Sequence, residues 1–447
     1  MSKKITIIIG AIIIIFLFFL GYAFLSKPTT QTTTEQTTGT NFFSNIFPFL
    51  KNTGSNITNS ILDLLKPTEE NTMPQETSLK KISSFPVAGF GVFNKERFVE
   101  VPEVSPAVII PTADTIINAN VIPELKPTPP PTEFIPAIKY VEKATGNIYQ
   151  TYADKIDERK LSSNIIPTVY ESFFGFGKNN ESVIMRYLQG NNTIETFIRT
   201  LPKQILGGDI VEDNSTPGSF LPENITDLSV SPDASQIFFL FNTQNNSVGI
   251  TANSNGEKKT QVFVSPFTEW LSQWPNDRMI TLTTKPSYNV PGYLYAVDPI
   301  KKDFNKILGG INGLTSLTSP SGKMVLYSGS NLSLYLYDAG SKNSKFIGLN
   351  TLPEKCVWNK TSTIIYCAVP KNTPMGQYPD SWYMGEVSFS DDIWYIDIAN
   401  GNTILVLSPT EAEGGEEIDA IKLALDENQN YLFFINKKDS YLWEFSL

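Results

Sequence analysis

The sequence predicts an all-β protein, a seven-bladed β-propeller closed by an N-terminal strand and preceded by one transmembrane helix. The first observation is a β-hairpin at Thr226–Phe241 (TDLSVSPDASQIFFLF), where an alternating apolar run, a Ser-Pro-Asp turn and a continuous apolar run follow one another. The second is that near-copies recur at Leu314–Tyr327, Lys355–Val369 and Ile418–Ile435. A repeated unit too small to bury its own core indicates a closed or stacked array. The third is an uncharged apolar stretch at Ile5–Leu25.

Composition narrows the classes of function. The chain has 447 residues, a net charge of −10 and no cluster of Lys and Arg, so we expect no nucleic-acid partner. With 41% apolar and 12% aromatic residues, it has ample material for a sheet-rich core. Histidine is absent, which excludes His-based acid–base catalysis, Ser-His-Asp and Cys-His nucleophile systems and His-ligated zinc. We find no Gly-x-Ser-x-Gly, Gly-x-Gly-x-x-Gly or P-loop motif, and we expect no catalytic residues and no cofactor.

Residues 1–27 are predicted to be an N-terminal membrane anchor. Ile5–Leu25 is 21 residues without a charge, and as a helix it would span about 31 Å, which matches a bilayer core. A cleaved signal peptide is the alternative, but Phe24–Lys27 offers no small-residue cleavage site. Lys3 and Lys4 favour a cytoplasmic N-terminus, so we expect a single-pass cell-membrane protein whose remaining chain is extracytoplasmic.

Two segments connect the anchor to the repeats. Residues 28–40 are rich in Thr and have almost nothing to bury, which is typical of a solvated linker. Residues 41–78 begin with a membrane-proximal apolar segment, Asn41–Leu65, which is too apolar for a free linker. This segment could lie on the membrane surface, dock on the folded domain or self-associate, and the sequence does not choose among them.

Residues 79–447 are predicted to form the propeller, as seven units of four strands, a to d. Without the insertion Asn94–Pro136 they amount to roughly 47 residues per unit, against the 40–50 expected of propeller blades. The insertion carries the run Lys126–Thr132 (KPTPPPT), which favours extended polyproline II and is interpreted as a spacer. The first strand of each unit is expected to start near Pro86, Ile166, Thr226, Phe267, Leu314, Glu354 and Ile418, and the second unit to end near Leu206.

The seventh unit supplies only strands a, b and c, so its fourth strand has to come from elsewhere. Leu79–Ser83 (LKKIS) resembles the d-strand ends at Arg159–Ser162 and Leu405–Ser408, and it directly precedes the first strand a. We therefore predict that it pairs with Tyr441–Phe445 and closes the ring. Closure of this kind removes the two exposed edges of an open array.

The repeats resemble the WD40-like repeats of TolB-type propellers. The likeness rests on the turns at Ser231–Asp233 and Ser319–Lys323, on the apolar strand after each turn, and on the closing segments Tyr335–Asp338 and Ile393–Asp397. In the fourth unit the turn is Asn276-Asp277 and departs from the pattern. The resemblance covers Leu79–Leu447 and implies a fold and a tendency to bind proteins, because such propellers have many unrelated functions.

Cys356 and Cys367 are the only cysteines. They fall on neighbouring strands of the sixth unit, on either side of a turn, where directly opposite residues have Cα separations of about 4.5–5.5 Å that a disulfide can bridge. We expect a disulfide, given an exported location. Two buried thiols packed as small apolar side chains are the alternative. A metal site is not expected, because two cysteines without histidine fall short of four ligands.

Acidic and aromatic residues gather in connections that the propeller geometry places on one face, where the b–c and d–a loops meet. These loops are Gly207–Asn224, Lys371–Asp392 and Pro409–Glu417. Exposed aromatics beside charge are favoured at interfaces, so this face is our candidate binding surface. Solvated acidic loops with aromatics tucked over the blade are the alternative. The candidate residues are Tyr378, Asp380, Trp382, Tyr383, Asp391, Asp392, Glu411, Glu413, Glu416 and Glu417.

The sequence thus predicts a non-enzymatic, membrane-anchored scaffold that binds a protein or another cell-envelope component. Two alternatives remain open. One is an envelope glycan hydrolase that uses loop carboxylates, which could also bind Ca²⁺, although no spacing motif supports either. The other is a structural subunit of a surface assembly, with Asn41–Leu65 as the oligomerising segment. The sequence names neither the ligand nor the oligomeric state.

Overall fold

The computed structural model describes residues 79–99, 130–163, 166–175, 182–190, 192–202, 204, 206 and 218–447. The predicted anchor Ile5–Leu25, the linker, the segment Asn41–Leu65 and most of the Pro-rich insertion lie outside the described residues. Within the described ranges, no helix has both the length and the apolar character needed to cross a membrane.

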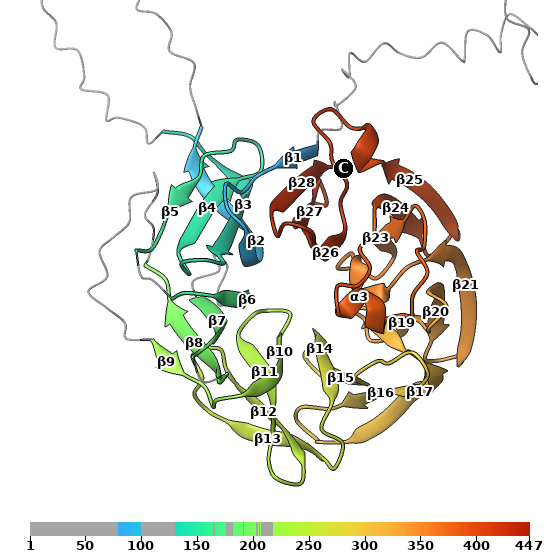
Figure 1. Ribbon diagram of the computed structural model, residues 1–447. Helices are drawn as coiled ribbons and strands as arrows, with labels where there is room; N and C mark the ends of the chain where they lie inside the picture. Colours follow the sequence, from blue (N-terminus) through green and yellow to red (C-terminus); the bar gives the residue numbers. More distant parts are fainter. Residues whose placement is uncertain are drawn as a thin grey trace, which may run out of the picture. The chain divides into compact units, whose positions relative to one another are not determined.

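Seven four-stranded antiparallel sheets are arranged as blades around a central opening, which confirms the predicted seven-bladed propeller (Figure 1). Blade one contains β2 (Val87–Phe98), β3 (Thr132–Glu142), β4 (Ile148–Tyr152) and β5 (Arg159–Lys160); blade two contains β6 (Val169–Gly175), β7 (Ser182–Leu188), β8 (Ile194–Thr200) and β9 (Ser219–Phe220). Blade three contains β10 (Ile225–Val230), β11 (Gln236–Asn242), β12 (Ser247–Asn253) and β13 (Thr260–Ser265); blade four contains β14 (Trp270–Asn276), β15 (Met279–Thr284), β16 (Pro291–Val297) and β17 (Phe304–Asn312). Blade five contains β18 (Thr315–Thr318), β19 (Met324–Ser328), β20 (Ser333–Asp338) and β21 (Asn343–Asn350); blade six contains β22 (Cys356–Trp358), β23 (Ile364–Pro370), β24 (Asp391–Asp397) and β25 (Asn402–Leu407).

Blade seven is built from both ends of the propeller domain. Its strands are β26 (Ala420–Leu425), β27 (Tyr431–Asn436), β28 (Leu442–Ser446) and, at the outer edge, β1 (Leu79–Lys81). In the β1–β28 register Leu79 is opposite Phe445, and beyond the strand the Ile82 amide donates to the Leu442 carbonyl at 2.9 Å. The predicted closure of the ring by the N-terminal strand is therefore confirmed.

The hydrophobic core lies between neighbouring blades. Between blades seven and one, for example, Phe433 and Leu442 pack with Val87, Ile138 and Tyr140, all fully or almost fully buried. Each such side chain stabilises the fold by about 1.5–3 kcal/mol relative to an exposed one. Because every blade buries its faces against two neighbours, closure at blade seven stabilises the whole ring.

The recurring hairpin turn has a local chemical cause. Ser231 Oγ accepts from the Gln236 amide at 2.9 Å and donates to Asp233 Oδ1 at 2.6 Å, so one side chain spans the turn. In three other blades the first residue of the turn also accepts from the amide five residues further on: Ser319 from Met324 (3.1 Å), Asn359 from Ile364 (3.1 Å) and Asp426 from Tyr431 (2.7 Å). Ser, Asn and Asp are interchangeable here because each presents a short oxygen acceptor.

The structure differs from the predicted boundaries in two places. In blade one the β2–β3 hairpin continues past Asn94, which is opposite Pro136, as far as Phe98 and Thr132, so the true insertion is shorter than residues 94–136. In blade two the fourth strand is not near Leu206 but is β9, which pairs with β8 through only two residues. A two-residue strand carries no alternating pattern, so the sequence could not show it.

Candidate functional site

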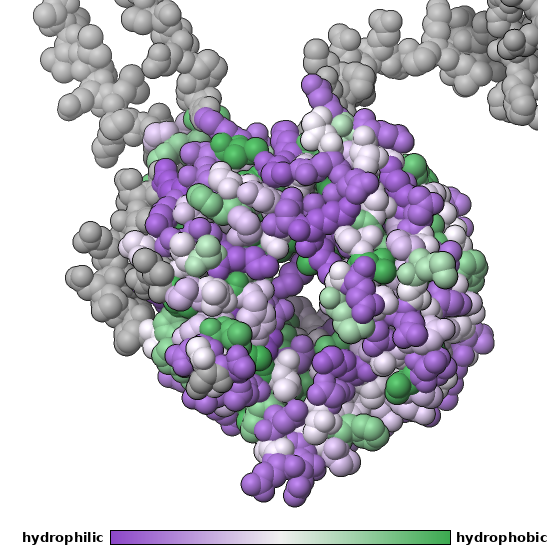
Figure 2. All heavy atoms as spheres, viewed as in Figure 1, coloured by the Kyte–Doolittle hydropathy of each residue, from purple (hydrophilic) through white to green (hydrophobic). Residues whose placement is uncertain are grey.

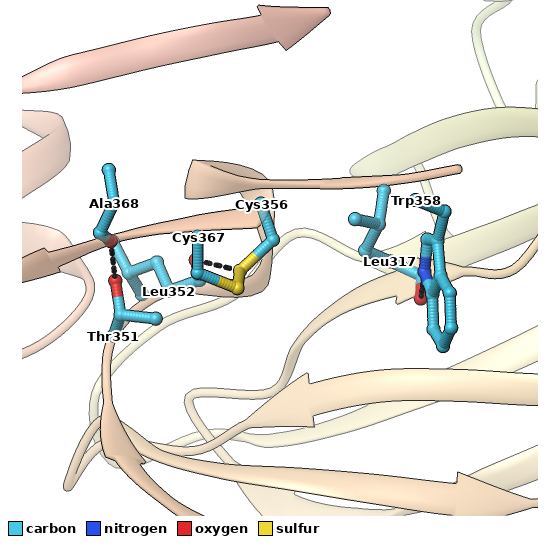
Figure 3. Close-up of a disulfide and its surroundings, with 7 residues drawn as sticks. All are labelled: Leu317, Thr351, Leu352, Cys356, Trp358, Cys367 and Ala368. Carbon is cyan, nitrogen blue, oxygen red and sulfur yellow. Dashed lines mark hydrogen bonds between the residues drawn. A yellow bond between two sulfur atoms is a disulfide. The ribbon is translucent and has the colours of Figure 1, made fainter. Parts of the chain in front are cut away.

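The two cysteines form a disulfide beside the β23–β24 connection. Cys356 and Cys367 are directly opposite each other on β22 and β23, with a Cα separation of 4.0 Å (Figure 3). Hydrogen bonds flank the bridge and join blade six to blade five: Thr351 Oγ1 donates to the Ala368 carbonyl at 2.6 Å, and Trp358 Nε1 to the Leu317 carbonyl at 3.4 Å. The disulfide therefore fixes the strand from which the largest connection of the candidate face begins.

That connection, residues 371–390, contains the short helix α3 (Asp380–Tyr383), which lies beside the central opening in Figure 1. Tyr378 and Trp382 are buried, and they pack with Phe389, Leu332 and Leu352. These two aromatics of the candidate face therefore form a small core within the connection itself. This agrees with the alternative stated above, in which the aromatics pack over the blade and are not exposed. They offer almost no surface to a partner.

A buried ion cluster holds this core in place. Lys355 closes the 3₁₀ helix η3 (Pro353–Lys355) just before β22, and its side chain is 0% exposed. Its Nζ lies 2.5 Å from Asp419 Oδ1 and 2.8 Å from Asp391 Oδ2, and it donates to the Ala420 carbonyl at 2.9 Å. Blades six and seven are joined by these contacts, because the three charged residues precede or start β22, β24 and β26.

Asp419 connects the cluster to the aromatic core. Its carboxylate accepts from Trp382 Nε1 and the Phe389 amide, both at 3.0 Å, and from Ser388 Oγ at 3.1 Å. Burial opposes the charged form of Asp419, but Lys355 and these donors outweigh it, so its pKa is lowered. The Lys355 ammonium also lies 5.2 Å from the Trp382 ring centroid and 5.4 Å from that of Phe389.

Asp391, a predicted binding residue, is part of this cluster rather than of the surface. It is 1% exposed, and burial raises its pKa to about 6 although Lys355 pulls in the opposite direction. A carboxylate at this depth serves packing, because a buried charge is tolerated only when it is paired. Asp392, next along the strand, accepts from Ser408 Oγ at 2.6 Å and lies 3.2 Å from Lys371 Nζ.

The outer part of the connection reaches other blades. Asp380 accepts from the Tyr288 amide of blade four at 2.5 Å. Tyr383, 36% exposed, donates to Glu354 at 2.5 Å, and desolvation raises the pKa of Glu354 to about 7. Lys437 of blade seven donates to the Trp382 carbonyl and lies 4.3 Å from its ring centroid. The connection is thus fixed to blades four, six and seven.

Exposed apolar side chains project from this fixed connection. Met375 is 99% exposed and Met384 is 66% exposed. On the neighbouring β25–β26 connection, Glu411 and Glu413 are exposed and form no ion pair or hydrogen bond through their side chains within the part of the chain that the structure describes. We call Met375, Tyr383, Met384, Glu411 and Glu413 the rim surface. Figure 2, in the view of Figure 1, shows the molecule hollowed at the centre of the ring.

The other two predicted glutamates pair with lysines. Glu416 lies 2.5 Å from Lys81 of β1, and Glu417 lies 2.6 Å from Lys438. Both pairs are accessible to solvent and therefore contribute little to stability. Of the ten predicted residues, the structure thus brings three to the rim surface, places three in the buried core and cluster, and gives the remaining four a hydrogen-bond or ion-pair partner.

Sequence reasoning missed the charged groups on the inner strands. Lys422 of β26 contacts Glu171 of β6 at 3.4 Å and donates to the Ala88 carbonyl of β2 at 3.5 Å, so it links blades seven, one and two. Arg186, almost fully buried, donates to Glu171 and to the Ile225 carbonyl, each at 2.5 Å. Lys355 was missed as well, since a lysine just before an apolar hairpin looks like any other surface lysine in the sequence.

Comparison with known proteins found similar chains only among solved structures. No family model matches the chain, and no curated protein matches it. Among solved structures it is similar to an oligogalacturonate lyase in complex with manganese, at 8% identity over 70% of this chain and 85% of that one, with a TM-score of 0.46. TolB from Acinetobacter baumannii matches at 9% identity over 68% and 61%, with a TM-score of 0.36. The tricorn protease matches at 14% identity over 67% of this chain, which spans 27% of the protease, with a TM-score of 0.34.

Proposed function

We propose that the protein is a membrane-anchored, extracytoplasmic β-propeller that binds a protein or another cell-envelope component through the rim surface. The observation that carries the proposal is the exposure of Met375 and Met384 on a connection whose inner residues are fixed by a buried ion cluster. Methionine is over-used at binding surfaces, because its flexible thioether adapts to many partner shapes.

Preorganisation strengthens this argument. The connection is held by Asp380 to blade four and by Lys355 to blade seven, and the strand from which it begins, β23, is joined to β22 by the disulfide. Binding would therefore order few additional backbone residues, and less of the interaction energy would be lost as entropy. The acidic side chains Glu411 and Glu413 add a negatively charged border, which favours a partner with basic residues opposite them.

Anchoring and export are supported by the sequence and by the cysteines. The uncharged stretch Ile5–Leu25 is long enough for a bilayer, and Lys3 and Lys4 favour a cytoplasmic N-terminus. A disulfide between Cys356 and Cys367 suits an oxidising compartment.

Two of the loop carboxylates that a glycan hydrolase would use, Asp391 and Asp392, are held by other side chains of the part of the chain that the structure describes. Asp391 is buried against Lys355, and Asp392 is bonded to Ser408, so neither carboxyl is presented to a substrate. We therefore keep binding as the proposed function.

The test is recovery of partners by full-length protein from native membranes. The double substitution Met375→Ser and Met384→Ser removes the exposed thioethers; the matched control is Ile404→Ser, an exposed residue on the outer strand β25. We expect the double variant to recover a partner at least about tenfold less well than the wild type, as for two interface side chains worth about 1 kcal/mol each, and the control to behave as the wild type. Equal recovery by all three proteins would refute the proposal that the rim surface binds the partner. Cleavage of a glycan by the purified protein, lost on Glu411→Gln, would refute the binding role.

A further inference from the structure

A second site lies on the other face of the ring, where the a–b and c–d turns meet. Between blades three and four the structure has a pocket of about 420 Å³, within the range of small-molecule sites. Its walls come from the β10–β11 and β12–β13 turns of blade three and from the β14–β15 and β16–β17 turns of blade four. None of these residues belongs to the rim surface.

One wall of the pocket is formed by amide side chains. Gln236 on β11 and Asn253 on β12 are directly opposite each other in the sheet, and both line the pocket. Asp277, at the tip of the β14–β15 turn, lines it from blade four. In residues 218–447, which the structure describes without a gap, none of these three side chains has a hydrogen-bond partner. The pocket therefore offers two amides and one carboxylate that are available to a ligand.

One aromatic residue, Trp274, adds an apolar side chain to these polar groups. Trp274 on β14 lines the pocket and is 93% buried, with its other neighbours in the apolar cluster of blades three and four. Its indole N–H is a buried donor that has no acceptor among the described residues. A buried unpaired donor is costly, and among the described residues that line this pocket Trp274 is the one that carries such a donor.

Charge argues against an anionic ligand. The pocket is lined by Asp233 and Asp277 against a single cation, Lys258. Asp233 is held ionised, because Ser231 and Ser235 donate to its carboxylate and lower its pKa. The net charge of the lining is negative, so the pocket lacks the excess of positive charge that a phosphate or uronate ligand favours.

We propose that this pocket binds a neutral mono- or disaccharide. A sugar ring presents neighbouring hydroxyls, which both donate and accept, and these suit the paired amides and the Asp277 carboxylate. The same ring has apolar C–H groups that can contact the small part of Trp274 that lines the pocket. Amides, a carboxylate and an indole around a volume of about 420 Å³ are the combination that such a ligand requires.

The test is isothermal titration of full-length protein with cellobiose, maltose and N,N′-diacetylchitobiose, with digalacturonic acid as the anionic probe. The detergent must have no sugar head group, because such a group would compete. We expect saturable binding of at least one neutral disaccharide with a Kd of about 1 mM or tighter, at which one weak site is measurable. Asp277→Ala and Asn253→Ala should each weaken this binding by about fivefold, the loss expected for one hydrogen bond.

The matched control is Asp303→Ala, which removes an exposed carboxylate that does not line the pocket. It should bind as the wild type does, and urea unfolding of each variant shows that the fold is kept. Three results would overturn the proposal: no binding of any neutral probe, tighter binding of digalacturonic acid, or binding that Asp277→Ala and Asn253→Ala leave unchanged. Because the rim surface is on the opposite face, failure here leaves the partner recovery experiment unaffected.

Discussion

Glu444 is a buried carboxyl at the closure of the ring, and its removal should change how stability depends on pH. It lies in the middle of β28, between Phe433 of β27 and Lys80 of β1, and its side chain is 0% exposed. Neither carboxyl oxygen has a hydrogen-bond partner among the described residues. Burial raises its pKa from 4.5 to about 8; Lys80 opposes this, and Asp154 and Asp426 add to it.

The sign and size of the effect follow from the two pKa values. In the unfolded chain Glu444 releases its proton near pH 4.5, whereas the folded protein keeps that proton until about pH 8. The stabilising contribution of the protonated form is therefore complete below about pH 4.5 and is lost as the pH rises to about 8. At about 1.4 kcal/mol per pKa unit the loss amounts to about 5 kcal/mol. Glu444→Gln keeps the size of the side chain and removes the titration.

The assay is urea unfolding of full-length protein at pH 5, 7 and 9, followed by intrinsic tryptophan fluorescence, to which Trp443, buried beside Glu444 on the same strand, contributes. We expect the variant and the wild type to be similar near pH 5 and the variant to be more stable by several kcal/mol at pH 9. Glu413→Gln, an exposed carboxyl, is the control and should follow the wild type throughout. Parallel pH curves for Glu444→Gln and the wild type would show that Glu444 is not desolvated.

Three further predictions concern the contacts that hold the ring and the candidate face. Lys355→Met leaves two buried carboxyls without their cation and should lower the unfolding free energy by about 3–5 kcal/mol. Hydrogen exchange in residues 371–390 should become faster, and unchanged exchange would show that Lys355 does not hold this connection in place. Reduction of Cys356–Cys367 should cost about 2–3 kcal/mol, seen as a lower urea midpoint that Cys356→Ala reproduces without reductant. Deletion of residues 79–83 exposes the edge of β28 and should cause association in light scattering, so a stable monomer would count against edge protection.

The sequence was sufficient for what depends on short-range pattern. The hairpins, the blade count and the pairing of Leu79–Ser83 with the last strand follow from apolar alternation and from turn residues such as Ser231. The opposition of Cys356 and Cys367 follows from counting residues on both sides of one turn. Features of this kind can be predicted from residues that are close in the sequence within one unit, or from a comparison of one unit with another.

For the candidate site, the sequence could predict which connection forms it but not which of its side chains are buried. Residues 371–390 do lie beside the central opening, but the sequence could not show that Trp382 turns inward, because its partner Asp419 is 37 residues away in the next blade. Lys355 binds Asp419 across 64 residues, and Lys422 meets Glu171 across 251. Side-chain contacts between blades depend on how the ring closes, and no local periodicity records them.

The proposed binding role is tested most directly by site-specific photo-crosslinking in native cells. A photoreactive amino acid in place of Met384 would lie on the rim surface, and the same residue in place of Ile404 would lie on the outer strand of the same blade, comparably exposed. We predict a discrete covalent adduct with an envelope partner from position 384 and none from position 404. Adducts of equal yield from both positions, or none from position 384, would contradict the rim surface as the binding site.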